Sequence, residues 1–319
     1  MSTASRASKS AFSKLAKGIL TAYWEANPTE AVFYGLHRYG GRVMDLRPVS
    51  MQRRLARIRR DLNSLVAVGD VDELSPDLRL ELGILRSKLL VEQFMLAGSR
   101  EPRESPLATV GALNLVNYLL KEYAPLDARL RSAEKLQAQV PTYLDVVRRI
   151  TTRQLAETQY EMGEMVVSGI IDSYREELPP FFEKVPPATR RRLERTNAVA
   201  TAALEGFHQE LQAKYKPRIR KTFALGRRKY ERMLWAEHLS RLSIERLLEV
   251  GTADLGANRS AFTEAARAVD PSKDPAAVMR DISSDHPTAE TLIEDAARTL
   301  EDIRSFIVGH DNVTIPAED

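Results

Sequence analysis

The stretch SPDLRLELGILRSKLLVEQFML, from Ser75 to Leu96, decides the fold class because its apolar residues recur with the period of an α-helix. Ser75 precedes Pro76, and a capping hydroxyl followed by proline at the first helical position is typical of a helix start. Apolar residues then line one helical face at Leu78, Leu82, Leu85 and Leu89. We therefore predict a helix over residues 76–97.

The same apolar period continues along most of the chain, whereas alternating strand patterns and Asn-Gly or Asp-Gly hairpin turns are absent from the sequence. We predict further helices over residues 8–26, 28–36, 50–67, 106–123, 128–139, 141–157, 159–178, 187–214, 227–239, 243–269, 275–283 and 287–308. The predicted fold class is therefore all-α: a large antiparallel multi-helix assembly with short loops and no significant sheet.

The clearest internal break is the proline-containing stretch PPFFEKVPP at residues 179–187. We predict an N-terminal helical subdomain over residues 1–178 and a C-terminal helical subdomain over residues 179–319. The two are expected to form one continuous helical unit.

The composition is that of an ordinary globular protein, with 43% hydrophobic and 29% charged residues among 319. There is no cysteine, so disulfides, thiolate nucleophiles and cysteine-based zinc sites are excluded. The basic, serine-rich residues 1–18 lack the apolar stretch of a signal peptide, and no apolar run reaches the length of a membrane span. We expect a cytoplasmic protein that does not enter a membrane; an organellar presequence is the weaker alternative.

Charge is unevenly spread along the chain. Residues 1–60 hold 12 basic and 3 acidic side chains, and residues 188–232 hold 13 and 4, whereas residues 233–319 hold 8 and 17. Such asymmetry is compatible with a face that binds polyanions, or with basic and acidic segments that pack near each other. The helical spacing of the basic residues favours the second interpretation, so we do not expect nucleic acid to be a partner.

Motifs for catalysis are missing. The five histidines, at positions 37, 208, 238, 286 and 310, lie too far apart in sequence for a His-Glu-x-x-His zinc motif. Glu205 and His208 form one Glu-x-x-His pair, which is fewer than a di-iron bundle needs. The sequence also lacks a Gly-x-Ser-x-Gly elbow and a phosphate-binding loop. We predict no catalytic residue, no metal ligand and no cofactor in this chain.

Two helical pairs leave alternatives open. Glu161 and Glu164 could act in acid–base chemistry if they were buried, but the favoured interpretation is solvated charge. Trp235 and His238 lie one turn apart, either as a substrate-binding pair or as a packed aromatic residue with a polar neighbour.

The segment FYGLHRYGGRVMDLRP, from Phe33 to Pro48, is the most unusual loop of the sequence. Glycines at positions 35, 40 and 41 surround His37, Arg38 and Tyr39, and Asp45 follows. Glycine-rich backbone that carries polar side chains is a frequent place for binding residues. The alternative is a tight helix connection in which Asp45 or a backbone carbonyl satisfies His37.

At this segment the chain resembles the bacterial family known as domain of unknown function number 885. The stretch AYWEANPTEAVFYGLHRYGGRVMDLRPVS is similar to the opening of that family, through Pro28, Glu30, Ala31, Gly35, His37, Asp45 and Ser50. Residues 74–90, 125–150 and 225–251 are similar to later helices of the family. The resemblance thus covers nearly the whole chain, by scattered pattern and without a sharp catalytic signature.

The resemblance implies a relation to zinc-dependent peptide hydrolysis, which in the family depends on a His-Glu-x-x-Pro-Gly-His motif in the C-terminal half. This chain lacks that motif, so we expect it to correspond to the N-terminal, non-catalytic helical half, with zinc implied only for the other half. By analogy, this half would shape one side of a substrate cleft. The candidate substrate-binding residues are His37, Arg38, Tyr39, Asp45, Trp235 and His238.

Three hypotheses follow. In the favoured one, the chain docks to a separately encoded catalytic half, and a broad exposed apolar surface marks the docking face. In the second, it is a free-standing helical scaffold or binding protein without enzymatic activity. In the third, it is an enzyme with an unrecognised site. The expected partners are a catalytic half or a second copy of the chain, with a peptide-like ligand as a further candidate.

Overall fold

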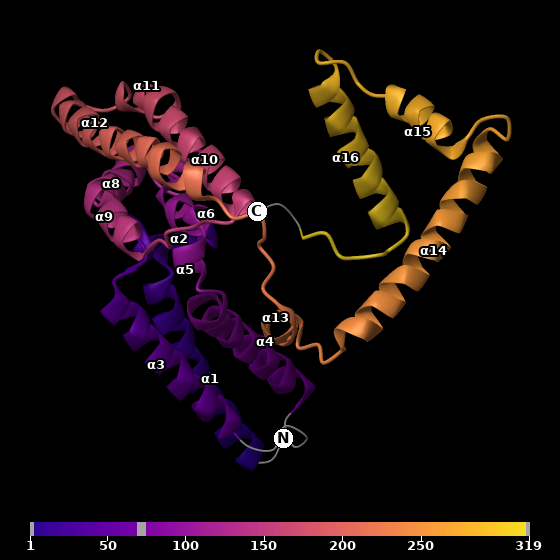
Figure 1. The fold of residues 1–319 in the computed structure, drawn as a ribbon, viewed down its shortest axis with the longest axis horizontal. Helices are drawn as coiled ribbons and strands as arrows, with labels where there is room; N and C mark the ends of the chain where they lie inside the picture. Colours follow the sequence, from indigo (N-terminus) through magenta and orange to yellow (C-terminus); the bar gives the residue numbers. More distant parts are fainter. Residues whose placement is uncertain (1–2, 69–74, 317–319) are drawn as a thin grey trace. The chain divides into compact units, whose positions relative to one another are not determined.

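A computed structural model describes residues 3–68 and 75–316, with side chains described from residue 11 onward. Within these residues the only strand-like pairing is an isolated bridge between Ala156 and Arg220, and the rest of the regular structure is helical (Figure 1). The predicted all-α fold class is therefore confirmed.

The chain divides into two compact units, unit 1 over Met1–Arg241 and unit 2 over Leu242–Asp319. The division that we expected at residues 178 and 179 lies inside unit 1, where helices on both sides of it pack against each other. The structure separates the chain instead at the link between the thirteenth and fourteenth α-helices.

The helices of unit 1 are α1 (Thr3–Ala26), α2 (Pro28–Phe33), α3 (Pro48–Val66), α4 (Pro76–Gln93), α5 (Glu101–Glu104), α6 (Pro106–Val110), α7 (Val116–Leu119), α8 (Leu126–Gln137), α9 (Val140–Ile150), α10 (Glu157–Asp172), α11 (Pro179–Phe182), α12 (Pro187–Glu210) and α13 (Arg227–His238). Those of unit 2 are α14 (Ile244–Val269), α15 (Pro275–Ser284) and α16 (Leu292–Gly309). Helices α4, α10 and α12 each end in a wider π-helical turn.

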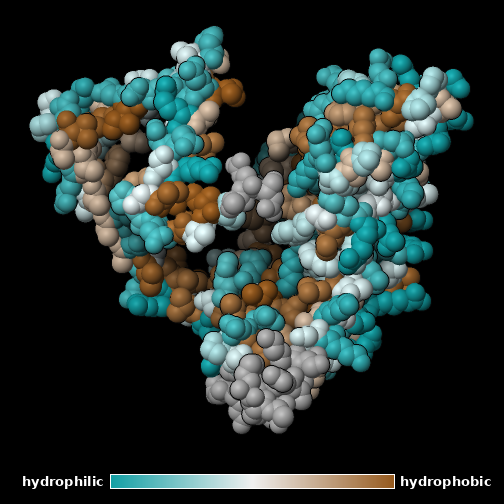
Figure 2. All heavy atoms as spheres, turned by 180° about the vertical axis from the view of Figure 1, so that it is seen from behind, coloured by the Kyte–Doolittle hydropathy of each residue, from teal (hydrophilic) through white to brown (hydrophobic). Residues whose placement is uncertain are grey.

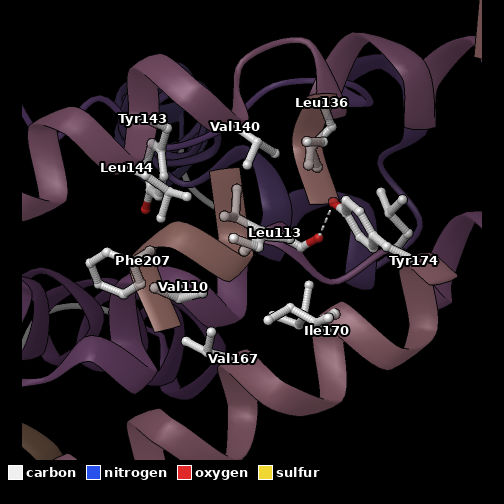
Figure 3. Packing of buried hydrophobic residues seen from close by; sticks show 14 of the residues in the cluster. Val110, Leu113, Leu136, Val140, Tyr143, Leu144, Val167, Ile170, Tyr174 and Phe207 are labelled. Carbon is white, nitrogen blue, oxygen red and sulfur yellow. Dashed lines mark hydrogen bonds between the residues drawn. The ribbon is translucent and has the colours of Figure 1, made fainter. Parts of the chain in front are cut away.

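Unit 1 contains two hydrophobic clusters. The smaller one lies between α1, α3 and α4, which run side by side in Figure 1, and it includes Phe12, Ile19, Ile58 and Leu89. The larger one gathers the inner faces of α6 to α12 (Figure 3). Both follow from the apolar periodicity of the sequence, because each helix buries its leucine-rich face.

The prediction of one helix over residues 106–123 is wrong. The segment forms α6, a 3₁₀ turn at Gly111–Leu113 and α7. The hydroxyls of two buried tyrosines replace lost helical hydrogen bonds there: Tyr143 donates to the carbonyl oxygen of Thr109, and Tyr174 to that of Leu113, each at 2.8 Å (the second is drawn in Figure 3). Long-range side-chain partners of this kind override local helix propensity.

Unit 2 differs from unit 1 in how few of its side chains are buried. Of its described residues, only Ala266 and Val278 are buried, and its helices carry many exposed large apolar side chains. Figure 2 shows hydrophobic patches on the surface of the molecule. Because folded domains normally bury their apolar helix faces, unit 2 lacks a core of its own within the described residues.

Candidate functional site

The glycine-rich segment of residues 33–48 is fixed against the helices of the larger cluster. At Gly41 the amide donates to the hydroxyl of Tyr118 at 3.0 Å, and the carbonyl accepts from Nε2 of Gln139 at 2.7 Å. The backbone of Gly41 has φ of 75°, a left-handed conformation that favours glycine. A Cβ atom there would lie 2.7 Å from Cβ of Lys135, so the segment is a close-packed connection.

The first three candidate residues of this segment are engaged in contacts with aromatic rings. His37 stacks on the ring of Tyr123, with 3.4 Å between the ring centroids and 5° between the planes. Partial burial and the nearby charge of Lys121 lower the pKa of His37, which favours the neutral imidazole. The guanidinium of Arg38 lies over the ring of Tyr39, itself buried.

Asp45 does not contact His37, contrary to the alternative considered from the sequence. Its carboxylate accepts hydrogen bonds from the backbone and side chain of Arg47 and from the hydroxyl of Ser50, at 2.5–3.1 Å. These donors lower the pKa of Asp45 to about 2, the Arg47 side-chain bond being the largest cause. Since α3 begins at Pro48, Asp45 holds together the turn that starts this helix.

We expect Asp45→Asn to lower the free energy of unfolding by at most about 1 kcal/mol near neutral pH, because the pair is exposed. The folded-state pKa is depressed, so this contribution is present above the unfolded-state pKa and is lost as pH falls toward 2. Urea unfolding of the wild type and the variant at pH 7 and pH 3 measures it. A difference between the two proteins that is equally large at both pH values would contradict this role.

Asp45 also lines the rim of a half-enclosed cavity of about 240 Å³ between the end of α1, the segment before α3, and α3 to α6. Three methionines, Met44, Met51 and Met95, form part of its apolar wall. Its polar lining consists of Glu25, Asn27, Asp45, Ser50, Arg54, Glu92, Glu101 and Thr109. We call this space the methionine cavity.

One side of the methionine cavity is a nearly buried ion pair. Nε and Nη2 of Arg54 donate to the two carboxylate oxygens of Glu92 at 2.6 and 2.5 Å, with side-chain exposures of 10% and 11%. The amide of Asn27 lies 3.4 Å from the same carboxylate. The bidentate geometry offsets the cost of taking both charges out of water.

Glu101 faces the methionine cavity without a counter-ion. Among the described residues no cation pairs with its carboxylate, whereas Glu104 on the same turn pairs with Arg100 and Arg220. Desolvation and, to a lesser extent, the carboxylate of Glu237 raise the pKa of Glu101. An anion in such surroundings is stabilised by any cation that enters the cavity.

The remaining candidates lie at α13. His238 is exposed and lines a shallow apolar groove together with residues of α1 and α4, including Leu20, Leu80 and Ile84. Trp235 is not among the residues that line this groove; Arg86 and Arg241 lie over its ring. The six candidates are thus spread over several places, and only Asp45 reaches the methionine cavity.

One residue from each of two pairs singled out in the sequence, Glu161/Glu164 and Glu205/His208, is in contact in the structure. Glu164 on α10 and His208 on α12 lie 2.8 Å apart, while Glu205 pairs with Arg175. Glu164 has its pKa lowered mainly by the bond to His208. These are contacts between partly exposed helix faces, as the solvated-charge interpretation expected.

Within residues 3–68 and 75–316, no three His, Asp or Glu side chains are arranged to hold a metal ion. No described helix is both long and apolar enough to cross a bilayer.

Unit 2 presents ordered apolar stripes. On α14 every seventh residue is a large exposed apolar side chain: Leu248, Leu255, Phe262 and Val269, with exposures of 66, 51, 45 and 64%. On α16, Ile293, Leu300 and Ile307 are also seven residues apart, with Ala296 and Ile303 at the intervening positions. A seven-residue apolar repeat is the pattern by which helices pack against other helices.

Sequence reasoning missed Arg54, Glu92 and Glu101. Arg54 and Glu92 are charged residues within predicted helices, where solvent exposure is the usual expectation, and they are 38 residues apart. Glu101 lies between two predicted helices. Only tertiary packing brings them together, so no local signal could have identified them.

The profile of a family of bacterial proteins of unknown function, DUF885, matches residues 28–319. Among solved structures, the chain is similar to one from Shewanella oneidensis described as a "putative lipoprotein of unknown function", with a TM-score of 0.75 and 15% identity. The similarity covers 96% of this chain and 58% of that chain, so this chain spans less than two thirds of that relative. At this identity the likeness shows the fold alone. No curated protein matches the sequence.

Proposed function

This chain belongs to the bacterial family of unknown function DUF885, and from that premise we propose that it is the non-catalytic helical part of a zinc-peptidase-like protein. In this proposal, unit 2 docks the zinc-bearing part. That part supplies the metal and the peptide-hydrolysing residues, and this chain shapes one side of the substrate cleft.

The apolar stripes of α14 and α16 carry the proposal. Four large side chains spaced seven residues apart on α14 stand at 45–66% exposure, although burying one such side chain stabilises a protein by about 1.5–3 kcal/mol. Stripes this long are more than the scattered apolar residues of an ordinary surface. Their heptad spacing supports an α-helical partner.

Two more observations support the proposal that this partner is an additional stretch of polypeptide from a related protein. The solved relative has chain beyond the region that this protein covers, since only 58% of it is matched. Residues 233–319 are acidic, with 17 acidic and 8 basic side chains, so a partner helix with basic flanks would be complementary. The two parts could equally be joined in one chain or be encoded separately.

The metal belongs to the other part in this proposal because the described residues here do not fit it. The contribution of this chain is therefore a surface, and its side chains bind and orient without taking part in bond cleavage. We expect the purified chain to hydrolyse no peptide alone and to bind zinc at much less than one equivalent.

The test mixes this chain with a polypeptide that contains the His-Glu-x-x-Pro-Gly-His region of a DUF885 protein. We expect a one-to-one complex by size-exclusion chromatography with light scattering. The double variant Leu255→Asp/Phe262→Asp should weaken the complex at least about a hundredfold, because it places two charges in a desolvated apolar seam.

A matched control places the same two charges on the opposite face of α14. Ala253 and Ser260 lie two residues before the substituted stripe positions and are exposed, so Ala253→Asp/Ser260→Asp should leave the complex unchanged. Absence of a complex, or equal weakening by both double variants, would contradict the proposal. Self-association through the stripe without binding of the second polypeptide would favour a homo-oligomeric scaffold instead.

A further inference from the structure

The methionine cavity differs from the docking face in location and in chemistry. It lies wholly within unit 1 and is lined by residues of α1, α3, α4, α5 and α6 and of the adjoining segments. Its volume of about 240 Å³ corresponds to about eight water molecules, which is enough for a small organic molecule. Nothing proposed for unit 2 uses it.

The walls of the cavity suit an unbranched apolar body. Met44, Met51 and Met95 provide flexible, polarizable side chains, and Leu46 and Leu96 add aliphatic surface. Methionine-rich walls adapt to ligands of different outline, because each thioether side chain has several accessible rotamers.

The charge of the lining favours a cationic head group. Four carboxylates and one guanidinium line the cavity. Glu92 is occupied by Arg54 and Asp45 by Arg47. Glu25 is exposed to solvent, so it gains little from a further partner. Glu101 has no cation paired with it among the described residues, and it lines the methionine cavity together with Met95 and Pro102 while also bordering a neighbouring, more polar cavity. Glu101 is partly buried, and a carboxylate that loses part of its hydration without gaining a counter-ion is destabilised, so the cavity gains from a ligand that supplies a cation.

From this arrangement we propose that the methionine cavity binds a small primary amine with an apolar chain, whose ammonium group pairs with Glu101. The ammonium donates to the Glu101 carboxylate, and the chain lies against the three methionines. A carboxylate ligand is disfavoured, because four carboxylates and only one guanidinium line the cavity, and that guanidinium, of Arg54, is already paired with Glu92 through two of its three nitrogens. A neutral alcohol fills the same volume but leaves Glu101 without a counter-ion.

The methionines serve as reporters of binding. The chain has eight methionines, of which Met44, Met51 and Met95 line the cavity, while Met162, Met165 and Met279 lie elsewhere. With [¹³C-methyl]methionine protein, n-hexylammonium should shift the first three methyl signals and leave the last three in place. We expect 1-hexanol to bind about tenfold more weakly, the scale of one hydrogen bond to a charged group, and hexanoate not to bind at pH 7.

Two variants distinguish direct pairing of the ammonium with Glu101 from long-range attraction by a nearby carboxylate. Glu101→Gln should weaken n-hexylammonium binding about tenfold or more and leave 1-hexanol binding unchanged, which also shows that the cavity is intact. Glu237→Gln removes a neighbouring carboxylate that does not line the cavity and should change the affinity less than threefold.

Three outcomes would overturn the proposal. The first is no displacement of the Met44, Met51 and Met95 signals by n-hexylammonium. The second is equal affinity for the amine and the alcohol in the wild type. The third is a shift of Met233 and Met95 without a shift of Met44 and Met51, because Met233 and Met95 both line a neighbouring cavity that Glu101 and Glu237 share.

Discussion

Glu92→Ala is expected to lower the free energy of unfolding of unit 1 by about 3–5 kcal/mol, the cost of leaving a buried charge without its partner. Arg54 donates two of its nitrogens to Glu92, and its third nitrogen, Nη1, is buried without a hydrogen-bond partner. Removal of the carboxylate therefore leaves the guanidinium without an ion-pair partner. Urea unfolding followed by tryptophan fluorescence measures the change in unit 1, because Trp24 and Trp235 both lie there.

Two controls make this test specific. Asp127→Ala removes the exposed partner of Arg131 on α8 and should cost less than about 1 kcal/mol. The double variant Arg54→Met/Glu92→Leu removes both charges and should recover most of the lost stability, because a buried ion pair is often replaceable by apolar residues. A cost below 1 kcal/mol for Glu92→Ala would mean that Arg54 finds water or another acceptor, which would contradict its burial.

Gly41→Ala should be nearly as destabilising, at about 3 kcal/mol. The left-handed backbone costs a residue with a Cβ about 1–2 kcal/mol. The new methyl group would lie 2.9 Å from the carbonyl oxygen of Ser132 as well as against Lys135, and such overpacking costs typically about 1–3 kcal/mol. The same urea unfolding experiment measures the sum.

Gly35 provides the matched comparison for Gly41. It has a similar φ of 86°, but a Cβ there meets no atom within 4 Å. Gly35→Ala should therefore lower the free energy of unfolding only by the cost of the left-handed backbone, about 1–2 kcal/mol. Gly18→Ala, in open space within α1, should stabilise the protein by about 0.5–1 kcal/mol. Equal losses at positions 35 and 41 would show that packing against α8 contributes nothing.

Much of the fold could be predicted because it depends on local periodicity. The helix predicted over residues 76–97 is α4 with its π-helical end, and the one over 243–269 is α14 to within one residue. The prediction failed over residues 106–123, where Tyr143 and Tyr174 bind backbone carbonyls from more than 30 residues away. A single sequence gives no sign of such long-range partners.

The candidate site was less accessible to sequence reasoning for the same reason. The glycines of residues 33–48 correctly indicated an unusual backbone, but close packing on α8 explains Gly41, and His37 stacks on Tyr123 away from the cavity. Met95 and Pro102 are near Glu101 in the sequence, but Glu237 and the other walls of the cavity reach it only through tertiary packing. The substrate-binding role of His37, Arg38, Tyr39, Asp45, Trp235 and His238 stays a prediction.

The scarcity of buried side chains in unit 2 has a thermodynamic consequence. A helix in water gains little from its own hydrogen bonds, and most of its stability comes from tertiary packing. Helices α14 to α16 bury only Ala266 and Val278 among their described residues. In the complex that we propose, the free energy that orders these helices therefore comes mainly from the partner that covers their apolar stripes. Part of the free energy of contact with the partner would then be used to order α14 to α16. The proposed complex would therefore dissociate more readily than the size of its interface suggests.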